Sequence, residues 1–497
     1  MKFRLLCSSV FLLLAFLPFS VVKAQVVTAE ISGVVTDPSK SAVAGVKVVG
    51  KNLGTGFERI STTDEYGRYT LFALPLGPYS VRTESSTFKP MQRERLTLGI
   101  GDKVEVDFTL SMSDVKETVN VSEEAPQIQI SSAQVGKTVN TASIDSLPLN
   151  GRDFAQLAAL VPGVRQAGSS TTVRMSGQAY TSSSFKVDGM DNDSEYVSYR
   201  QARYSQDAIA EVQVLTNQFL PEFGRSSGGV VNVITRSGTN DFHGRAFYYG
   251  REDALDARNT FSTSKLPFER KQYGGTAGGP IKKDKTFFFG SVERLEDDNI
   301  TFIVTPGLSA DVPIPTRETL LFGKVTHQLN EKNLLQVNYN FDKITTGNQS
   351  VGGISLPDHS FTRKSTSNNV IFGDTTLLGP TTINELRVQF QRRDAGNIPD
   401  MPGRPEIRRP SSITGTPTST PATWLENKVS ISEALTHNFH AAGAHSIKAG
   451  AQLQFSRGNI LTEVYDNGQY IFATDKPFNA ADPTTYPTQY NLSTGSP

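Results

Sequence analysis

Apolar and polar residues alternate along several stretches in the second half of the chain. The clearest stretches are residues 335–342, 386–391 and 447–456. A period of two places apolar side chains on one face of a β-strand and polar side chains on the other. The best of these stretches approach the roughly 9–11 residues with which a β-strand crosses a bilayer. Segments rich in Gly, Pro and Ser, residues 343–365 and 395–424, are predicted to be long loops between strands.

This alternation predicts that residues 238–497 form antiparallel strands of a transmembrane β-barrel, with one face toward lipid and the other toward a wet lumen. We count about ten such strands, too few to enclose a domain of a hundred residues. The barrel is therefore expected to be incomplete in this chain. A soluble antiparallel sandwich produces the same alternation, but the strand lengths and the N-terminal leader favour the membrane.

The first part of the chain has shorter β-prone runs. Between residues 26 and 112 these runs are separated by turn sequences, which are Asp37-Pro38, Gly54-Thr55-Gly56, Asp64-Glu65-Tyr66-Gly67 and Leu76-Gly77-Pro78. Glycine and proline supply the backbone angles that a chain reversal needs. Short strands at near-regular spacing predict a β-sandwich over residues 25–112, so the fold class is expected to be mainly β.

Residues 113–130 have a different composition, polar and acidic. One short β-prone core lies within them, formed by Glu117, Thr118, Val119, Asn120 and Val121. Taken alone, this segment is an ordinary flexible linker.

Residues 131–237 indicate a compact α+β unit. Residues 155–160 are predicted to form a short helix, with Asp153 as its N-cap and Pro162-Gly163 as its stop signal. Residues 208–215 are predicted to be an alternating strand. The glycine turn at Gly228-Gly229 is predicted to lead into a second strand.

The N-terminus has the pattern of a secretory signal peptide. Lys2 and Arg4 precede an apolar run over residues 5–17, and cleavage is expected between Ala24 and Gln25. The run is short and followed by proline, which argues against the alternative of an uncleaved membrane anchor. Cleavage of residues 1–24 removes Cys7, the one cysteine of the chain. The mature protein is therefore expected to have neither a disulfide nor a thiolate site.

Composition and charge narrow the classes of partner. Hydrophobic residues make up 37% of the chain, charged residues make up 20%, and the formal net charge is +0. Without the leader and its three Lys/Arg residues the net charge becomes −3. The chain has no large basic excess, so nucleic acid is not an expected partner.

The sequence offers no candidate catalytic site, and we expect neither enzyme activity nor a cofactor. None of the six histidines lies in a His-Glu-x-x-His frame. The string Gly224-Arg225-Ser226-Ser227-Gly228 matches a nucleophile elbow, but Pro221 precedes it and a β-prone run follows it. The elbow needs a strand before the serine and a helix after it, so a glycine turn is the better interpretation.

One acidic cluster remains, formed by Asp188, Asp191, Asp193 and Glu195. Hard carboxylate oxygens suit calcium. The spacing is not that of an EF-hand, however, and a solvated turn is the favoured interpretation. We therefore predict no metal site and leave calcium binding at this cluster open.

Residues 25–112 resemble the carboxypeptidase regulatory-like domain. The resemblance is carried by Gly33-Val34-Val35-Thr36-Asp37, Ala44-Gly45-Val46-Lys47-Val48, Thr63-Asp64-Glu65-Tyr66-Gly67-Arg68-Tyr69 and Leu74-Pro75-Leu76-Gly77-Pro78-Tyr79. The family usually has a Gly-aromatic pair where this chain has Thr87-Phe88. The resemblance implies an accessory fold without peptidase chemistry.

Residues 131–237 resemble the plug domain of TonB-dependent receptors. Four motifs occur in the family's order, namely Leu147-Pro148-Leu149-Asn150-Gly151-Arg152, Val187-Asp188-Gly189, Glu211-Val212, and Gly228-Gly229-Val230-Val231-Asn232-Val233-Ile234-Thr235. In this context residues 117–121 resemble a TonB box, and a flexible extended segment of this kind can add as a strand to a partner's sheet. The N-terminal domain together with Asn150-Gly151-Arg152 indicates the Oar-like subgroup.

The resemblance implies an outer-membrane receptor of a Gram-negative-type bacterium that takes up a large or scarce substrate by energy-coupled rearrangement of its plug. Its expected partners are a TonB-type periplasmic energy-coupling protein, outer-membrane lipid and an unknown extracellular substrate. The resemblance also implies a barrel of about twenty-two strands, so the chain is expected to be an N-terminal fragment. The alternative is a secreted or surface structural or adhesive β-module protein without transport activity.

Overall fold

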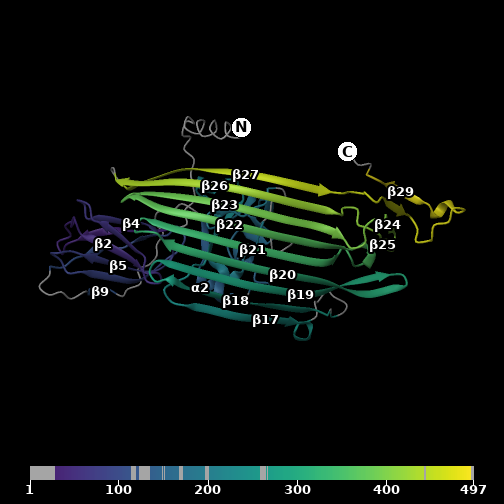
Figure 1. Ribbon diagram of the computed structural model, residues 1–497, viewed down its shortest axis with the longest axis horizontal. Helices are drawn as coiled ribbons and strands as arrows, with labels where there is room; N and C mark the ends of the chain where they lie inside the picture. The colour runs from purple at the N-terminus through teal and green to yellow at the C-terminus, as the bar shows by residue number, and fades with distance from the viewer. Residues whose placement is uncertain are drawn as a thin grey trace, which may run out of the picture.

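The computed structural model of the chain describes residues 28–112, 119–121, 135–147, 149, 151–166, 172–195, 201–257, 265, 267–440 and 444–493. These residues form an N-terminal β-domain, an inner unit of mixed structure and a long curved sheet (Figure 1). The predicted leader and its cleavage site at Ala24 and Gln25 lie outside them. Within the described ranges, no helix has both the length and the apolar character that a membrane crossing requires.

The N-terminal β-domain consists of two sheets with a shared core. One sheet has the order β4-β1-β7 with β8 beside β1, and the other has the order β3-β2-β5-β6-β9. The strands are β1 (Ala29–Thr36), β2 (Lys47–Asn52), β3 (Glu58–Thr62), β4 (Arg68–Leu74), β5 (Gly77–Glu84), β6 (Met91–Leu98), β7 (Lys103–Glu105), β8 (Phe108–Thr109) and β9 (Val119–Val121). Ile31, Leu71 and Tyr79 are buried between the sheets. The predicted β-sandwich is confirmed.

The inner unit is built around a sheet of order β10-β15-β16-β13-β14, and β11 pairs with β12 beside it. Its elements are β10 (Val135–Val139), α2 (Thr141–Ser146), α3 (Ala155–Ala158), β11 (Val164–Gln166), β12 (Val173–Met175), η1 (Tyr180–Ser182), β13 (Ser183–Val187), β14 (Met190–Asp191), η2 (Gln206–Ala208), β15 (Ile209–Asn217), η3 (Pro221–Phe223) and β16 (Gly229–Thr235). All of β16 is buried. A strand covered on both faces needs no alternation, which explains its nearly continuous run of apolar residues.

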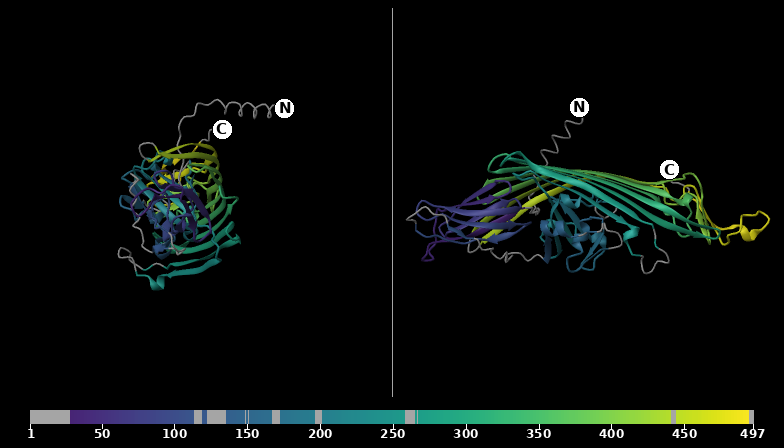
Figure 2. Two further views of the ribbon diagram at one scale, coloured as in Figure 1. Left: turned by 90° about the vertical axis from the view of Figure 1, so that its left-hand side faces the viewer. Right: turned by 90° about the horizontal axis from the view of Figure 1, so that it is seen from below.

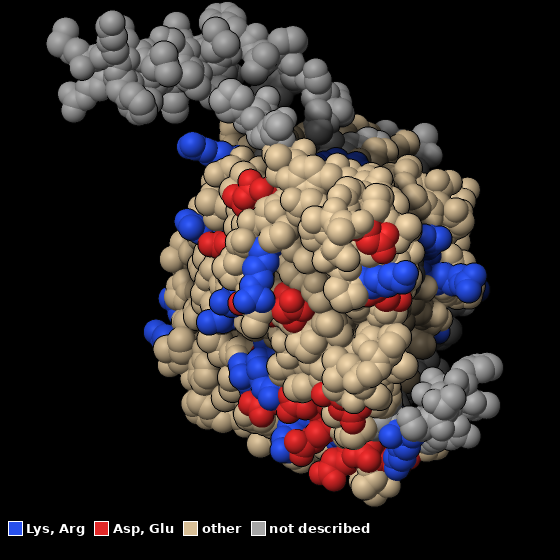
Figure 3. Space-filling view, turned by 90° about the vertical axis from the view of Figure 1, so that its right-hand side faces the viewer, with Lys and Arg blue, Asp and Glu red and all other residues tan. Residues whose placement is uncertain are grey.

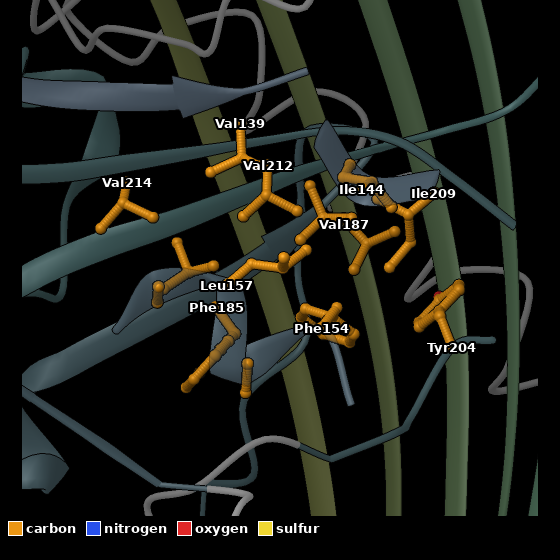
Figure 4. Packing of buried hydrophobic residues seen from close by; sticks show 14 of the residues in the cluster. Val139, Ile144, Phe154, Leu157, Phe185, Val187, Tyr204, Ile209, Val212 and Val214 are labelled. Atoms are coloured by element: carbon orange, nitrogen blue, oxygen red, sulfur yellow. The ribbon is translucent and has the colours of Figure 1, made fainter. Parts of the chain in front are cut away.

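Helices α2 and α3 close the core of the inner unit. Figure 4 shows Ile144 of α2 and Leu157 of α3 packed near Val212 of the sheet. The predicted helix at residues 155–160 is confirmed but ends at Ala158. The predicted N-cap is off by one residue, since the N-cap is Phe154, although Asp153 Oδ1 still accepts from the Ala155 N–H at 3.0 Å. Helix α2 was not predicted, because six residues carry too little periodicity.

The curved sheet is a partial barrel of nine antiparallel strands, of order β17-β18-β19-β20-β21-β22-β23-β26-β27. The strands are β17 (His243–Glu252), β18 (Glu269–Lys282), β19 (Thr286–Thr305), β20 (Leu308–Gln328), β21 (Asn333–Gln349), β22 (Phe361–Gly379), β23 (Thr382–Pro399), β26 (Ala422–His440) and β27 (Ala444–Thr462). The sheet curves around one side of the inner unit (Figure 2). The turn η4 (Asp253–Leu255) follows β17.

The strands are longer than the sequence predicted. Most of the predicted loop 343–365 belongs to β21 and β22, and the predicted loop 395–424 contains the ends of β23 and β26. Strands that continue beyond the bilayer have no lipid face, so their sequences lose the alternation while their backbones still pair.

A small sheet lies at the end of the barrel where the long connections gather, in the order β25-β24-β28-β29. Its strands are β24 (Glu406–Arg409), β25 (Ser412–Thr414), β28 (Gln469–Phe472) and β29 (Pro487–Asn491), with the turns η5 (Pro357–His359) and η6 (Pro483–Thr485) nearby in the chain. Figure 3 shows this end of the molecule, where most of the surface is uncharged and basic and acidic side chains are interspersed. This end therefore presents no extended field of one sign.

The outward face of the partial barrel is apolar. Successive Cα partners from β19 to β27 form one outward row, which is Phe288, Val325, Val337, Phe372, Val388, Ile431 and Leu453. Val337, Ile431 and Leu453 are among the exposed large hydrophobic residues. The predicted alternation over residues 335–342, 386–391 and 447–456 is thereby confirmed. An apolar outer face is what a strand needs to contact hydrocarbon.

Candidate functional site at the seam between the inner unit and the barrel wall

The inner unit meets the barrel wall along a polar surface, which is the candidate functional site. We call it the seam, meaning the inward side chains of β18 to β27 and the inner-unit groups that contact them. One inward row of successive Cα partners is Ser291, Phe322, Asn340, Asn369, Gln391 and Lys428. All six are buried, and five of them are polar. Buried polar groups are normally satisfied by hydrogen bonds, and here the inner unit supplies many of the partners.

Arg152 joins the start of the inner unit to the wall. Its Nη2 lies 2.6 Å from Asp207 Oδ2, and its Nε lies 3.7 Å from Glu293 Oε2 on β19. The guanidinium carbon also lies 4.3 Å from the ring centre of Phe247 and 5.1 Å from that of Tyr249. Arg152 is thus held both by carboxylates and by the aromatic faces of β17.

Arg203 makes a second link of the same kind. Its Nη1 pairs with Glu318 on β20, and its Nη2 donates to the Gly151 carbonyl. Its backbone N–H donates to Asp342 Oδ2 on β21 at 2.9 Å. A buried charge is tolerated only when it is paired and hydrogen-bonded, so these contacts fix the register of the inner unit on the wall.

Asp188 lies at the centre of a third link. Its carboxylate accepts from the Thr235 N–H at 2.9 Å and from the Thr235 hydroxyl at 2.6 Å. From the wall, Lys324 Nζ approaches to 3.2 Å and Asn338 Nδ2 donates at 2.6 Å. One side chain therefore connects strand β16 of the inner unit with strands β20 and β21.

Two glycines allow the backbone to pack closely against neighbouring residues, Gly189 at the seam and Gly229 inside the inner unit. Gly189 has φ +83°, and a Cβ there would lie 2.9 Å from Arg387 Nε on the wall. A Cβ at Gly229 would lie 2.3 Å from Met175 Sδ and 2.8 Å from the Leu215 carbonyl oxygen. Neither position accepts a side chain without a shift of its neighbours.

The acidic cluster is buried in the seam, and the predicted solvated turn is wrong. Asp188 and Asp191 are 2% and 3% exposed. Asp191 pairs with Lys186 and accepts from Gln452 Nε2 of β27 at 2.9 Å. Glu195 accepts from Gln454 Nε2 at 2.6 Å. The cluster is buried because strands of the wall cover it. The sequence shows the charges of this segment but not these strands, and the prediction failed for that reason.

These carboxylates are occupied by protein partners. The Asp193 carboxylate accepts from the Ser184 hydroxyl at 2.7 Å, and Glu195 pairs with Arg225. Over the described ranges, no group of three or more His, Cys, Asp or Glu side chains is arranged to hold a metal ion. Burial of the Asp193 carboxyl raises its pKa to about 6, because the hydrogen bond from Ser184 only partly offsets the loss of hydration.

Several seam amides keep an atom without a protein partner. Among the described residues, no protein donor reaches the side-chain oxygens of Asn338, Asn340, Gln389 and Gln391. All four are inward residues of the wall strands β21 and β23. Buried polar groups of this kind favour contact with water.

The seam brings together only part of the predicted signature. Gly151, Arg152, Asp188 and Gly189 all contact wall residues or residues that bind the wall. Gly228 and Gly229 instead lie inside the inner unit, at the start of β16. Asn150 lies outside the described residues.

The predicted coupling segment is separate from the seam. Glu117 and Thr118 lie outside the described residues. Val119, Asn120 and Val121 form β9, which pairs in parallel with β6 of the N-terminal β-domain.

Sequence analysis missed Arg203 and the wall carboxylates Glu293 and Glu318. Arg203 is an isolated charged residue in the sequence, whereas Glu293 and Glu318 each adjoin an arginine. Glu293 and Glu318 lie on the polar face of long strands. Their place on that face was the one feature of the sequence that could have indicated a contact with the inner unit. Their pairing with arginines more than a hundred positions away depends on the register of the barrel, which no local pattern contains.

Family models match two regions of the chain. Residues 234–311 and 308–493 match the outer membrane beta barrel domain, and residues 30–111 match the carboxypeptidase regulatory-like domain. The TonB-dependent transporter Oar of Myxococcus xanthus is 27% identical over 374 residues, which cover 67% of this chain and 35% of that relative. The chain thus spans about a third of the length of this curated relative.

Solved structures share the fold. The outer membrane transporter YddB from Escherichia coli has a TM-score of 0.55 at 13% identity, over 71% of this chain and 51% of that chain. The siderophore receptor PirA from Acinetobacter baumannii has a TM-score of 0.50 at 14% identity, over 65% of this chain and 48% of that chain. At these identities the likeness concerns the fold alone.

Proposed function

This chain belongs to the outer membrane β-barrel domain family, and on that premise we propose that it is part of an energy-coupled transporter whose inner unit is the plug. The chain is of the Oar-like, TonB-dependent type and lies in the outer membrane of a Gram-negative-type bacterium. In the proposal, residues 131–237 obstruct the lumen at rest and rearrange when a periplasmic partner supplies force.

The observation that carries the proposal is the polar seam. A domain that filled a barrel only for stability would pack through apolar side chains, because those contribute most to a permanent core. Arg152, Arg203 and Asp188 instead bind the wall through ion pairs and hydrogen bonds. Water can replace such contacts when the surfaces separate, so this seam suits a unit that moves.

The proposed contact for the energy-coupling protein is the segment 117–121. Its described part, β9, is the edge strand of a sheet. An extended edge strand can pair through its main chain with a strand of another protein. The substrate is proposed to be extracellular, and large or scarce. The mixed, mostly uncharged surface at the long-loop end (Figure 3) does not select a strongly charged class.

A secreted β-module protein is the weaker reading. It accounts for the N-terminal β-domain but not for the outward apolar row that runs from Phe288 to Leu453. Such a row would be costly in water and is suited to lipid.

The test is binding of a purified TonB-type periplasmic domain to outer membranes that contain the protein. Deletion of residues 117–121 is expected to abolish this binding and, once a substrate is known, to abolish uptake while leaving substrate binding intact. The variant N120P is expected to lose binding as well, because proline removes a main-chain donor. N120A keeps that donor and is the matched control. Unchanged binding after the deletion would remove the segment from the proposal.

A further inference from the structure

The N-terminal β-domain lies across one end of the partial barrel. Figures 1 and 2 show it beside the ends of the long strands and against the inner unit. The described connections at this end are short, residues 283–285, 329–332 and 380–381. Short turns face the periplasm in outer-membrane barrels. The domain therefore sits over the periplasmic opening.

The domain contacts the barrel at three separate points. The Asn240 N–H donates to the Gly54 carbonyl at 2.8 Å. Arg59 Nη1 donates to the Glu331 carbonyl at 2.8 Å, in the turn between β20 and β21. Phe72, Ala73 and Ile383 form a small buried apolar cluster, with Leu377 packed against it.

A fourth contact reaches the inner unit itself. The Ile100 N–H donates to Glu211 Oε2 on β15 at 2.8 Å. The loop that presents Ile100 is held by Asp102, whose Oδ2 accepts from the Gly99 N–H at 2.7 Å. Glu211 is only 7% exposed. One domain thus bridges the inner unit, the segment before β17, the β20–β21 turn and the ends of β22 and β23.

We propose that the N-terminal β-domain is a removable cap on the periplasmic opening, and that it must leave its seat on Glu211 and the wall turns before material passes. The inference rests on the proposed transport function. The cap is a separate folding unit, since Ile31, Leu71 and Phe108 belong to a core that includes no residue of the inner unit or the wall. Its release therefore leaves this core and the core of the inner unit intact, and separates only the small cluster of Phe72 and Ala73 with Ile383.

The seat is small and incompletely packed. A crevice of about 460 Å³ separates the domain from the wall turns and is lined by residues such as Arg59, Lys285 and Lys332. Four local contacts around a crevice can be broken at a cost far below that of unfolding the domain.

The position of β9 connects the cap with the proposed energy source. Strand β9 pairs with β6, from Met91↔Val119 to Arg93↔Val121. A pull on β9 therefore acts on the cap before it acts on the inner unit. In this order of events the cap leaves its seat first, and the pulling force then acts on the contacts of the seam.

Glu211 makes the seat sensitive to pH. Burial, together with the neighbouring Asp102 carboxylate, raises its pKa to about 7, and the hydrogen bond from Ile100 opposes this only in part. Undocking exposes Glu211 and returns its pKa toward 4.5. The seated form thus binds the proton more tightly, so seating weakens as pH rises from near 4.5 to about 7 and stays constant above that value. E211Q is expected to remove this dependence.

The experiment is a disulfide trap in native outer membranes. A Cβ built at Gly54 would lie 3.9 Å from Thr239 Cβ, which is within the range of a disulfide. The pair G54C/T239C is expected to cross-link spontaneously in resting membranes, as read by protection of the thiols from a maleimide-polyethylene glycol reagent. The matched control is S39C/T239C, because the Ser39 hydroxyl contacts Asp37 and Ser41 within its own exposed turn. This control pair is expected not to form a disulfide.

The trap then reports release. In energised cells that contain the coupling protein, cross-linking of G54C/T239C is expected to fall at least twofold, and a protonophore is expected to restore it. Adding E211A is expected to lower cross-linking in resting membranes. If G54C/T239C fails to accumulate, F72C/I383C tests the same seat. Equal cross-linking with and without the protonophore would overturn the cap while leaving binding at residues 117–121, and so the proposed function, standing.

Discussion

Asp188 shows how a single residue joins two parts of the molecule. Its carboxylate serves two donors on Thr235 and two side chains of the wall, Lys324 and Asn338. The backbone there is left-handed, with φ 46° at Asp188 and 83° at Gly189. The turn therefore aims the carboxylate at the wall, and glycine makes room for Arg387.

Replacing Asp188 is expected to weaken the seam. D188N keeps the size and tolerates the left-handed backbone, but it leaves Lys324 buried without its carboxylate. The expected loss in the free energy of unfolding is about 3–5 kcal/mol, measured by chemical denaturation of the protein in detergent. In D188N/K324Q part of the loss should be recovered. If the two single losses simply added, Asp188 and Lys324 would not be coupled.

Asp193 gives a prediction about acid stability. Its pKa in the folded protein is raised from 3.8 to about 6, chiefly by burial. The folded state therefore binds this proton more tightly than the unfolded state, and its contribution favours folding below about pH 4. That contribution is lost as pH rises to about 6. D193N is expected to flatten the stability profile between pH 4 and 6. A wild-type-like slope in D193N would assign the titration to another group.

At this scale the sequence revealed residue types but not partners. The Asn150-Gly151-Arg152 and Asp188-Gly189 motifs located two of the links. The burial of the acidic cluster was missed, because the covering residues Gln452 and Gln454 come from a strand more than 250 positions away.

At the scale of elements, side-chain alternation decided what could be predicted. Residues 335–342 alternate because their strand has lipid on one side and the inner unit on the other. Lipid requires apolar side chains, and the seam requires polar ones. Strand β16 does not alternate, because both of its faces are buried. The ends of β19 to β23 escaped prediction, since backbone pairing beyond the bilayer makes no demand on side-chain pattern.

The two faces of one sheet should respond differently to the same substitution. Val370 faces outward on β22 in the row Tyr339, Val370, Phe390, Val429 and Phe455. V370R is expected to cost about 2–4 kcal/mol, because arginine would enter hydrocarbon. T316R is the control, since Thr316 lies on the inward face opposite Asp297. The comparison uses the folded fraction in phospholipid vesicles, and equal losses would contradict the assigned lipid face.

At the scale of the whole molecule, the chain has separate hydrophobic cores. One core fills the N-terminal β-domain, and a larger one fills the inner unit and extends to Phe289 and Phe322 of the wall. The order of these bodies along the chain was visible in the sequence. Their arrangement was not, because it depends on contacts such as Ile100 with Glu211 that join residues over a hundred positions apart.

Separate cores predict separate unfolding. A fragment of residues 28–112 contains the whole N-terminal core and is expected to fold alone with a cooperative thermal transition. Circular dichroism provides the measurement. Y69F is expected to lower the fragment's stability by about 1 kcal/mol, because the Tyr69 hydroxyl donates to the Val106 carbonyl at 2.6 Å. A fragment that stays unfolded would show that the domain depends on its seat.

The polar lining between inner unit and wall also bears on durability. Apolar surfaces that are exposed to water tend to form non-native contacts, and molecules that repeatedly expose such surfaces aggregate. Here, Phe289 and Phe322 aside, parting would bare mostly hydroxyls, amides and charges, which water solvates. The inner unit can therefore separate from the wall and rebind it many times without aggregation.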